Sequence, residues 1–259
     1  MPLFTIMLPI VRPPALLPFA VESVLSQTPA DWELHIICDG APEATVAVAE
    51  AYAARDPRIK ARRFPKGERN GEHHRHLVLR EARSAYVAQI GDDDIWFPDH
   101  LRELELLLRD EVDFGHLLQC EIQTDGSALF IVGDLALEAT QGRMLSEEWT
   151  CFGPTAAGYR LETYRRLPVG WSPAPPDVPS DLFMWRKFLA LPGIRLGTRF
   201  TIQSVKMGAV KRPEVSLEQR REENARIAAM VASYECRSDL AAAAWRCTWQ
   251  NALAGLLAV

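Results

Sequence analysis

Apolar runs and helical stripes alternate along the first 110 residues. Short apolar runs ended by proline or glycine are typical of buried strands, and apolar residues three and four positions apart predict helices. We expect strands at residues 3–9, 32–40, 59–65 and 86–91. We expect helices at residues 15–28, 43–56, 76–85 and 97–110. This alternation predicts an α/β fold, with a mostly parallel sheet and helices on both faces.

The pattern changes after about residue 110. Residues 113–134 alternate as a strand, a turn and a strand, with Asp125-Gly126 as the hairpin turn. A proline-rich loop at residues 171–181 leads into an expected helix at 181–191. A charged segment, residues 216–235, and the Trp- and Ala-rich segment after it predict two more helices.

These changes divide the chain into three parts. We expect an α/β half at residues 1–110, a mixed half of the same domain at 111–215, and a C-terminal helical extension at 216–259. The sequence contains no internal repeat and no low-complexity tract.

Composition narrows the class of protein. The hydrophobic share of 48% and the charged share of 24% are ordinary for a globular chain of 259 residues. The net charge of -5 argues against a general nucleic-acid binder, because neutralising phosphates needs a basic surface. We therefore expect no nucleic-acid partner.

Cysteine spacing and the N-terminus bear on location. The 5 cysteines show no CxxC pairing, which is typical of free thiols in a reducing compartment. The first residues, "MPLFTIMLPIV", lack the basic start and cleavage site of a signal peptide, and no apolar run is long enough to span a bilayer. We expect a cytoplasmic protein, with contact to the inner face of a membrane as an open alternative.

Three adjacent carboxylates, Asp92, Asp93 and Asp94, follow the strand expected at residues 86–91. Repulsion among them would raise their pKa values unless a cation offsets it. Aspartate oxygens suit Mg²⁺ or Mn²⁺, and residues i and i+2 of a strand face the same way, which favours Asp92 with Asp94. The alternative is a solvated turn in which Asp94 or a neighbour caps the next helix.

The N-terminal half resembles a family 2 glycosyltransferase with the GT-A fold. The resemblance rests on "LPIVRPPALLPFAVESVLSQT", "WELHIICDG" and "REARSAYVAQIGDDDIWFPDHL", and more weakly on "GPTAAGYRLETYRRL" and "SDLFMWRKF". It spans about residues 5–190 and is strongest before residue 101. It implies a GT-A-like, Rossmann-type sheet and an inverting enzyme that uses a nucleotide-sugar, with a uridine diphosphate sugar as the first candidate.

The resemblance has four departures. They are Ile10, Val11 and Arg12 after Pro9, Cys38 before Asp39, His76 after Arg75, and Gly91 before the aspartates. In the family register Asp93 takes the place of the usual metal-binding aspartate, whereas Gly91 replaces a carboxylate. Strand geometry and family register therefore favour different aspartates as metal ligands.

The resemblance also implies roles for single residues. The expected nucleotide-binding residues are Pro9, Asp39, Arg75, Asp92 and Asp93, and the expected ligands of Mn²⁺ or Mg²⁺ are Asp92, Asp93 and Asp94. Asp39 could accept the imide N–H of uracil, and the planar fork of Arg75 suits phosphate oxygens. Each has a simpler explanation, because Asp-Gly ends a strand well and Arg75 lies in a polar segment.

Asp181 is the expected catalytic base, because the family places an acidic residue at the start of a helix beyond the mid-chain strand. Capping of that helix would also explain an aspartate there, and Asp177 is the nearby alternative base. Trp171 and Trp185 could stack on a sugar ring or pack in the core.

The resemblance assigns the nucleotide-sugar to residues 1–110 and the acceptor to residues 111–215. The expected acceptor is a glycan or a lipid-linked glycan, in polysaccharide biosynthesis. The C-terminal stripe has helical spacing and consists of Trp245, Trp249, Leu253 and Leu256. It could pack against the body, against a second copy in a homodimer, or against a membrane surface.

Two other functions stay open. A nucleotidyltransferase would need a glycine-rich phosphate loop near the first strand, and "LPIVRPPALL" has no glycine. A non-catalytic nucleotide- or glycan-binding subunit would be consistent with the substitutions at Ile10, Cys38 and Gly91. It would also be consistent with the absence of any histidine after His116, since such transferases often take a late histidine as a metal ligand.

Overall fold

A computed structural model describes residues 1–109, 111–123, 125–207 and 214–257. Its strands are β1 (Phe4–Ile10), β2 (Trp32–Asp39), β3 (Ile59–Phe64), β4 (Tyr86–Gln89), β5 (Ile95–Trp96), β6 (Phe114–Ile122), β7 (Ala128–Leu129), β8 (Ala157–Arg160) and β9 (Leu196–Lys206). Its helices are α1 (Leu17–Leu25), α2 (Glu43–Arg55), α3 (Glu72–Glu81), α4 (His100–Arg109), α5 (Glu138–Ser146), the 3₁₀ turn η1 (Pro154–Ala156), α6 (Leu161–Arg165), α7 (Ser180–Leu189), α8 (Leu217–Ala232) and α9 (Tyr234–Leu257).

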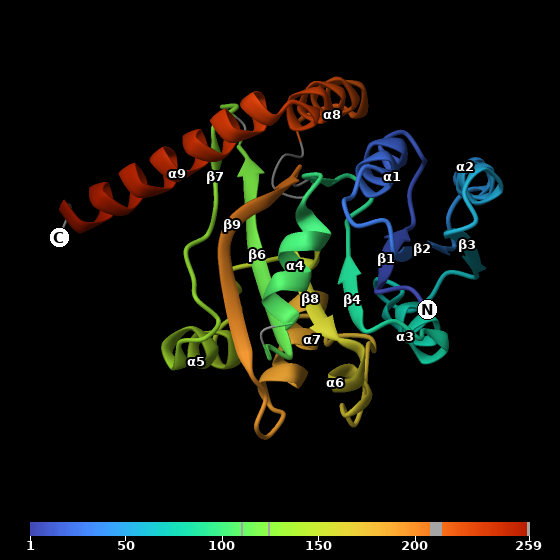
Figure 1. Ribbon diagram of the computed structural model, residues 1–259, viewed down its shortest axis with the longest axis horizontal. Helices are drawn as coiled ribbons and strands as arrows, with labels where there is room; N and C mark the ends of the chain where they lie inside the picture. The colour runs from blue at the N-terminus through green and yellow to red at the C-terminus, as the bar shows by residue number, and fades with distance from the viewer. Residues whose placement is uncertain (110, 124, 208–213, 258–259) are drawn as a thin grey trace.

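The strands form one sheet in the order β3-β2-β1-β4-β8-β6-β9-β5, with β7 paired to β6 (Figure 1). The first four strands in this order are parallel, which confirms the expected α/β half. β8 runs antiparallel to both β4 and β6 and makes the second half mixed. The parallel strands β1, β2 and β4 therefore end at one edge, where ligands bind in such sheets.

Alternating side chains of β1 pack against helices on the two opposite faces of the sheet. Ile6 and Leu8 pack in the cluster that α1, α2 and α4 complete, whereas Met7 points to the cluster that contains α3 and α7. Successive strand residues face opposite sides, so a strand buried on both faces is mostly apolar. This explains the apolar run of β1, where Thr5 is the one polar residue, whereas β2 also carries Glu33 and His35 near its start.

Two helices, α3 and α4, begin three or more residues away from their predicted starts. α3 begins at Glu72, four residues before the expected start, because Gly71 reverses the chain in the left-handed region with φ 66°. α4 begins at His100 and not at residue 97. The residues before it, Ile95 and Trp96, pair with β9 as a short strand and keep the chain extended there.

The second half contains elements that the sequence did not predict, namely α5, α6, β8 and β9. The sequence of β9 mixes polar and apolar residues without strict alternation, and its Phe200 is exposed, so its pattern does not predict a strand. The predicted turn at Asp125-Gly126 is confirmed, since β6 and β7 pair antiparallel and Gly126 has φ 81°.

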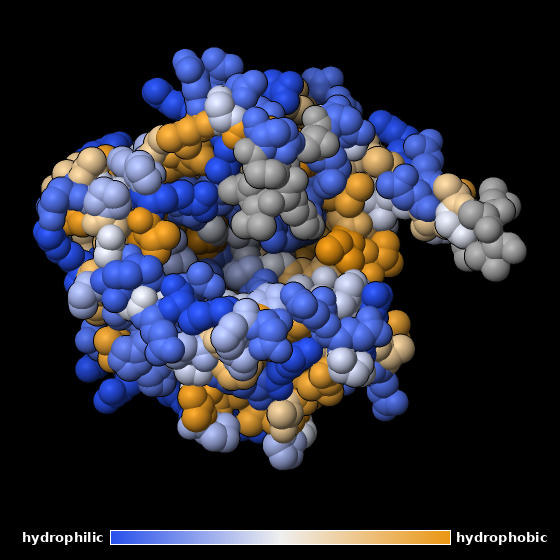
Figure 2. Space-filling view, turned by 180° about the vertical axis from the view of Figure 1, so that it is seen from behind, coloured by the Kyte–Doolittle hydropathy of each residue, from blue (hydrophilic) through white to orange (hydrophobic). Residues whose placement is uncertain are grey.

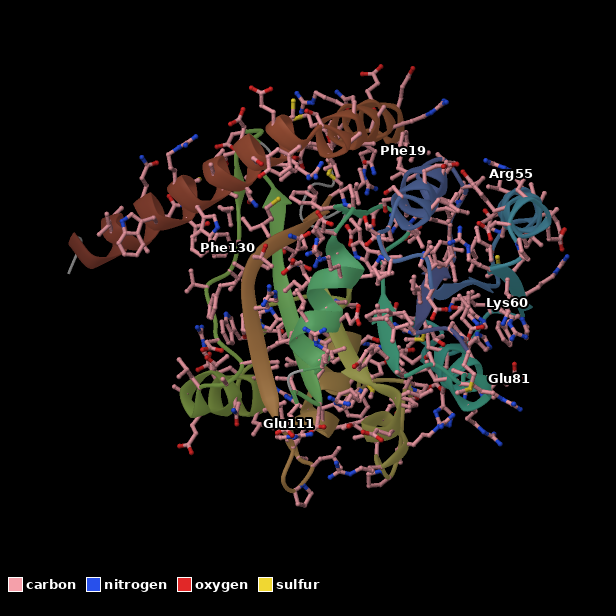
Figure 3. The ribbon with its side chains drawn as sticks, in the orientation of Figure 1. Phe19, Arg55, Lys60, Glu81, Glu111 and Phe130 are labelled. Atoms are coloured by element: carbon pink, nitrogen blue, oxygen red, sulfur yellow. The ribbon has the colours of Figure 1, made fainter. Side chains whose placement is uncertain are left out.

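α8 packs on β5 and α1, and α9 packs on β7 and then extends away from the body (Figure 1). Phe130 lies beneath α9, with its ring 4.6 Å from that of Trp245, and Phe19 lies on α1 beside α8 (Figure 3). Farther along, Trp249 is 66% exposed. Figure 2 shows α9 as an arm, with hydrophobic residues gathered at its base. The predicted stripe therefore packs on the body only in part, and the side chain of Leu256 lies outside the described residues.

No helix in the described ranges has the length and the hydropathy needed to cross a membrane. The free cysteines of these ranges include three buried ones, Cys38, Cys120 and Cys151.

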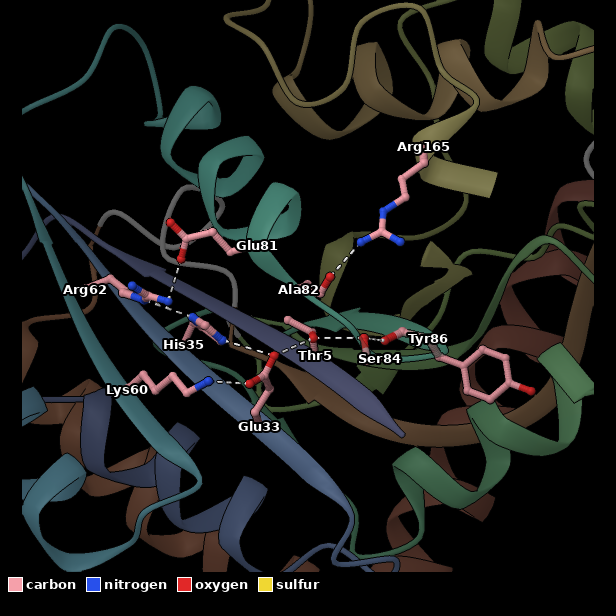
Figure 4. Close-up of polar contacts among 10 residues, drawn as sticks. All are labelled: Thr5, Glu33, His35, Lys60, Arg62, Glu81, Ala82, Ser84, Tyr86 and Arg165. Atoms are coloured by element: carbon pink, nitrogen blue, oxygen red, sulfur yellow. Dashed lines mark hydrogen bonds and ion pairs between the residues drawn. The ribbon is translucent and has the colours of Figure 1, made fainter. Parts of the chain in front are cut away.

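A polar network joins β1 to β4 at the opposite end of these strands from the site described below (Figure 4). Glu33 accepts from the Thr5 hydroxyl at 2.9 Å and pairs with Lys60 at 2.5 Å. A hydrogen bond with His35 lowers the pKa of Glu33 to about 2. Ser84 continues the network by donating to Thr5 at 2.8 Å. The network satisfies polar side chains that would otherwise be costly to bury.

We expect acid to destabilise the fold through His100. Its Nδ1 lies 3.0 Å from the Gln203 carbonyl, and burial lowers its pKa from 6.5 to about 3. Below pH 6.5 the unfolded chain therefore binds a proton that the folded chain does not. This histidine alone should remove roughly 1.4 kcal/mol of stability per pH unit between pH 6.5 and the folded pKa. Urea unfolding at several pH values measures the slope.

The variant His100→Gln should have a shallower pH dependence, because glutamine does not titrate in this range. The exposed His73 supplies the control, and His73→Gln should keep the slope of the parent protein. Equal slopes for His100→Gln and the parent would contradict the assignment.

Candidate active site

Three strand ends bring the predicted residues to one edge of the sheet. Asp39 is the last residue of β2, and Arg12 follows β1, which lies between β2 and β4. The aspartates follow β4 on the other side of β1. Pro9 lies inside β1, opposite Ile37, and is half-buried.

Arg12 forms a two-pronged ion pair with Asp92. Its Nε and Nη2 donate to Oδ2 and Oδ1 of Asp92, each at 2.7 Å. Its Nη1 lies 3.4 Å from Oδ2 of Asp93. Burial alone would lower the pKa of Arg12, but the charges of Asp92 and Asp93 raise it overall. Burial raises the pKa of Asp92, and Arg12 opposes that rise.

Asp93 is held in place by α8, the first of the two C-terminal helices. Nη2 of Arg220, in the first turn of α8, lies 2.6 Å from Oδ2 of Asp93. One turn later, Asn224 donates from Nδ2 to the backbone carbonyl of Asp93 at 2.9 Å. α8 therefore contacts both the side chain and the main chain of this aspartate.

Asp94 points into the protein. Its Oδ2 accepts from the Thr155 hydroxyl, and its Oδ1 accepts from the Met207 N–H at 3.1 Å. Burial and the charge of Asp93 raise the pKa of Asp94 to about 7. A Cβ on Gly91 would lie 2.7 Å from Oδ2 of Asp94, so this conformation of Asp94 requires a glycine at position 91.

The carboxylate oxygens of the run suit a hard divalent cation. Oδ1 of Asp93 is the one among them with no donor from the described residues. Within these residues no three His, Cys, Asp or Glu side chains are grouped to hold a metal ion. Carboxylate chemistry thus suits a cation at Asp93, but the site is already occupied by a positive charge. The cation would have to displace Arg220, which lies 2.6 Å from Oδ2 of Asp93, whereas Arg12 can keep its two hydrogen bonds to Asp92.

Asp39 is 1% exposed, accepts two hydrogen bonds and lies close to a histidine ring. Nζ of Lys66 lies 2.8 Å from Oδ2, the Gly67 N–H donates to Oδ1 at 2.5 Å, and Nδ1 of His74 lies 3.2 Å from Oδ1. Lys66 is 52% exposed, so it is the contact that a ligand could displace most easily. A Cβ on Gly71 would lie 2.5 Å from Oδ2, so this glycine allows the close approach of α3.

Arg75 is a buried cation, 4% exposed. Its Nη2 donates to the Asn70 carbonyl at 3.0 Å, and its guanidinium carbon lies 4.2 Å from the ring centre of Trp171. Its Nε has no hydrogen-bond partner in the described part of the chain. Burial lowers the pKa of Arg75, whereas the charges of Glu72, Asp181 and Asp39, among others, oppose that change. Arg75 is therefore suited to receive an anion.

Asp181 is half-buried at the second position of α7. Its Oδ1 accepts the N–H of Leu182 at 2.9 Å. The residue that precedes the helix is Pro179, so Asp181 is not the N-cap. The alternative candidate, Asp177, is exposed in the proline-rich loop.

Glu72 ties this loop to α3. It is fully buried, and its two oxygens accept from the Ser180 hydroxyl at 2.6 Å and the Asn70 N–H at 3.0 Å. Arg69 donates to two carbonyls of the same loop. The start of α7, with Asp181, is thus fixed relative to Arg75.

Trp171 and Trp185 are 2% and 0% exposed, so both pack in the core, the second of the two predicted alternatives. The sequence did not identify Glu72, Thr155, Arg220 or Asn224 as site residues, and it noted Arg12 only as a departure. The position of Arg12, close after the first predicted strand, was a signal that could have identified it as a site residue. Arg220 had none, because the charged pattern of α8 does not distinguish it from the exposed Arg221.

Comparison with known proteins gives a family and several relatives. The family "Glycosyl transferase family 2" matches residues 5–167. A segment of 102 residues is 35% identical to the uncharacterized protein y4gI of Sinorhizobium fredii and covers 39% of this chain and 11% of that protein. A segment of 93 residues is 30% identical to the uncharacterized glycosyltransferase EpsJ of Bacillus subtilis and covers 36% and 26%. This chain thus spans a minor part of the length of both relatives.

Solved structures share the fold. TarS 1-349 of S. aureus superposes with a TM-score of 0.63 at 15% identity, over 89% of this chain and 65% of that one. The mannosyltransferase PcManGT of Pyrobaculum calidifontis, solved with GDP-Man and Mn²⁺, has a TM-score of 0.58 at 18% identity, over 87% and 64%. At these identities the likeness establishes a shared fold.

We expect Glu72→Ala to destabilise the protein by about 3 kcal/mol. The substitution leaves the donors of Ser180 and Asn70 without their acceptor, and it removes a negative charge that stabilises the buried Arg75. Denaturant unfolding measures this loss. Glu68→Ala, at an exposed position nearby, is the control and should change stability by less than about 0.5 kcal/mol. A loss below about 1 kcal/mol for Glu72→Ala would show that the loop is held by other contacts.

Proposed function

This chain belongs to glycosyl transferase family 2. We propose that it transfers a sugar from a nucleotide diphosphate sugar to the hydroxyl group of an acceptor, with inversion at the anomeric carbon. A uridine diphosphate sugar is the first candidate donor, since TarS has been solved with UDP and with UDP-GlcNAc. A glycan or lipid-linked glycan is the proposed acceptor.

One observation carries the proposal. Arg75, a buried cation from α3, is influenced by the charges of Glu72, Asp181 and Asp39, but it forms no direct ion pair with a carboxylate of the described residues. Burying a guanidinium without an ion-pair partner costs several kcal/mol, so such a residue is a strong candidate for ligand binding. A diphosphate would supply a direct ion-pair partner for Arg75, between Asp39 on the side of the base and Asp181 on the side of the acceptor.

Each residue has a distinct proposed role. Asp39 accepts the imide N–H of the base once Lys66 moves aside, and Pro9 lines the same strand end. Arg75 offsets the negative charge that grows on the leaving diphosphate. Asp181 takes the proton from the attacking hydroxyl. The proline-rich loop and Glu72 hold Asp181 in place.

The donor side is assigned to residues 1–110 and the acceptor side to residues 111–215. A divalent cation, Mn²⁺ or Mg²⁺, would be held at Asp92, Asp93 and Asp94, with Asp93 as the central ligand. When bound it would supply positive charge to the leaving diphosphate. We further propose a cytoplasmic location.

A second function has its own support. A non-catalytic subunit that binds nucleotide or glycan would tolerate Gly91 and the occupied aspartates, and it would not need a base at Asp181. The two functions differ in turnover and not in nucleotide binding.

The test measures nucleoside diphosphate release from a panel of nucleotide-sugars, with Mn²⁺ and with candidate glycan acceptors. We expect Asp181→Asn to lower kcat by roughly 10²- to 10⁴-fold, as the loss of a general base does. The dissociation constant for UDP, measured by calorimetry, should not change, because Asp181 acts on the acceptor.

The exposed Asp177 lies in the same loop, so Asp177→Asn should retain parent turnover. Full turnover by Asp181→Asn would place the base elsewhere. Nucleotide binding without release from any donor would favour the non-catalytic subunit, and no binding of any nucleotide would refute both functions.

A further inference from the structure

Two guanidinium groups converge on one carboxylate oxygen at the end of β4. Oδ2 of Asp93 lies 2.6 Å from Nη2 of Arg220 and 3.4 Å from Nη1 of Arg12. The side chains of Arg220 and Asp93 are each 11% exposed, so water screens their attraction only weakly. The Coulombic attraction within the pair is therefore stronger than in an exposed ion pair, and the cost of removing both groups from water opposes it.

The two arginines differ in what else holds them. Arg12 has its own bidentate partner in Asp92, whereas Asp93 is the only carboxylate that Arg220 contacts among the described residues. Arg220 also lies outside the segment that matches the family, which ends at residue 167. Its contact with Asp93 therefore belongs to the C-terminal extension of this chain.

The helix that carries Arg220 is attached at a second point on the same face. Asn224 is fully buried and donates to the backbone carbonyl of Asp93, four residues after Arg220. Farther along α8, Ile227 and Val231 pack with Ile95 and other residues near the same strand end. Release of Arg220 from Asp93 would therefore remove one of the two polar contacts that hold the first turns of α8 at this strand end, and it would leave the apolar contacts farther along the helix in place.

A divalent cation and Arg220 cannot both occupy the Asp93 carboxylate at close range, because like charges in a buried site repel strongly. We propose that Arg220 competes with the divalent cation for Asp93. In the donor-free protein Arg220 holds this position, and the arrival of the cation releases it and loosens the first turns of α8. The inference rests on the proposed function for the presence of a cation at Asp93.

The test uses Mn²⁺ alone, titrated into the full chain by calorimetry. Arg220→Gln should bind Mn²⁺ roughly tenfold more tightly than the parent, as expected if Arg220 occupies Asp93 about nine-tenths of the time. Arg221→Gln, which removes the same charge from an exposed position on α8, should bind as the parent does. Equal affinities for all three proteins, or no Mn²⁺ binding by any of them, would overturn the proposal.

A second measurement needs no variant and covers the case in which Arg220→Gln fails to fold. Hydrogen exchange of the parent protein should speed up at residues 217–224 when Mn²⁺ is added to saturation, while residues 227–231 should be unaffected. Mn²⁺ binding with unchanged exchange at residues 217–224 would overturn the proposal. Failure of UDP to bind, with both Mn²⁺ results as expected, would count against the proposed function and leave the competition in place.

Discussion

Burial of three adjacent carboxylates at the end of β4 is the constraint on which the rest of the site depends. Each buried charge costs several kcal/mol unless a partner is supplied close by. The partners come from distant parts of the chain: Arg12 from the loop after β1, Thr155 from η1, and Arg220 from α8. The positions of all three segments are therefore determined by one strand end.

The same requirement explains why two features that look unrelated occur together. Gly91 leaves room for Asp94 to turn inward, where the Thr155 hydroxyl and a backbone N–H receive it. A side chain at position 91 would push Asp94 back toward Asp93 and increase the repulsion between them. A residue that departs from the family pattern is thus part of how this chain distributes its negative charge.

Local patterns were enough to predict the first four strands and the position of Asp39 and Asp92–Asp94 at the strand ends, because both depend on short spacings. The need for a positive charge beside Asp92–Asp94 was also predictable from repulsion. The identity of that charge was not, since Arg220 is 127 positions from Asp93 and sits in a helix whose charged pattern is typical of a solvated face. Glu72 was missed for a similar reason, because a polar segment gives no sign that one of its residues will be fully buried.

The place of β9 in the sheet has a consequence for the order of folding. β9 is the last strand along the chain, yet it lies between β6 and β5. When residues 1–167 have left the ribosome, β6 still has one open edge and β5 has no neighbour to pair with. Exposed edges of this kind invite pairing with other chains. The nascent protein therefore carries an incomplete sheet until residue 206 has left the ribosome, and the time for which this edge is exposed depends on how fast the final stretch is translated.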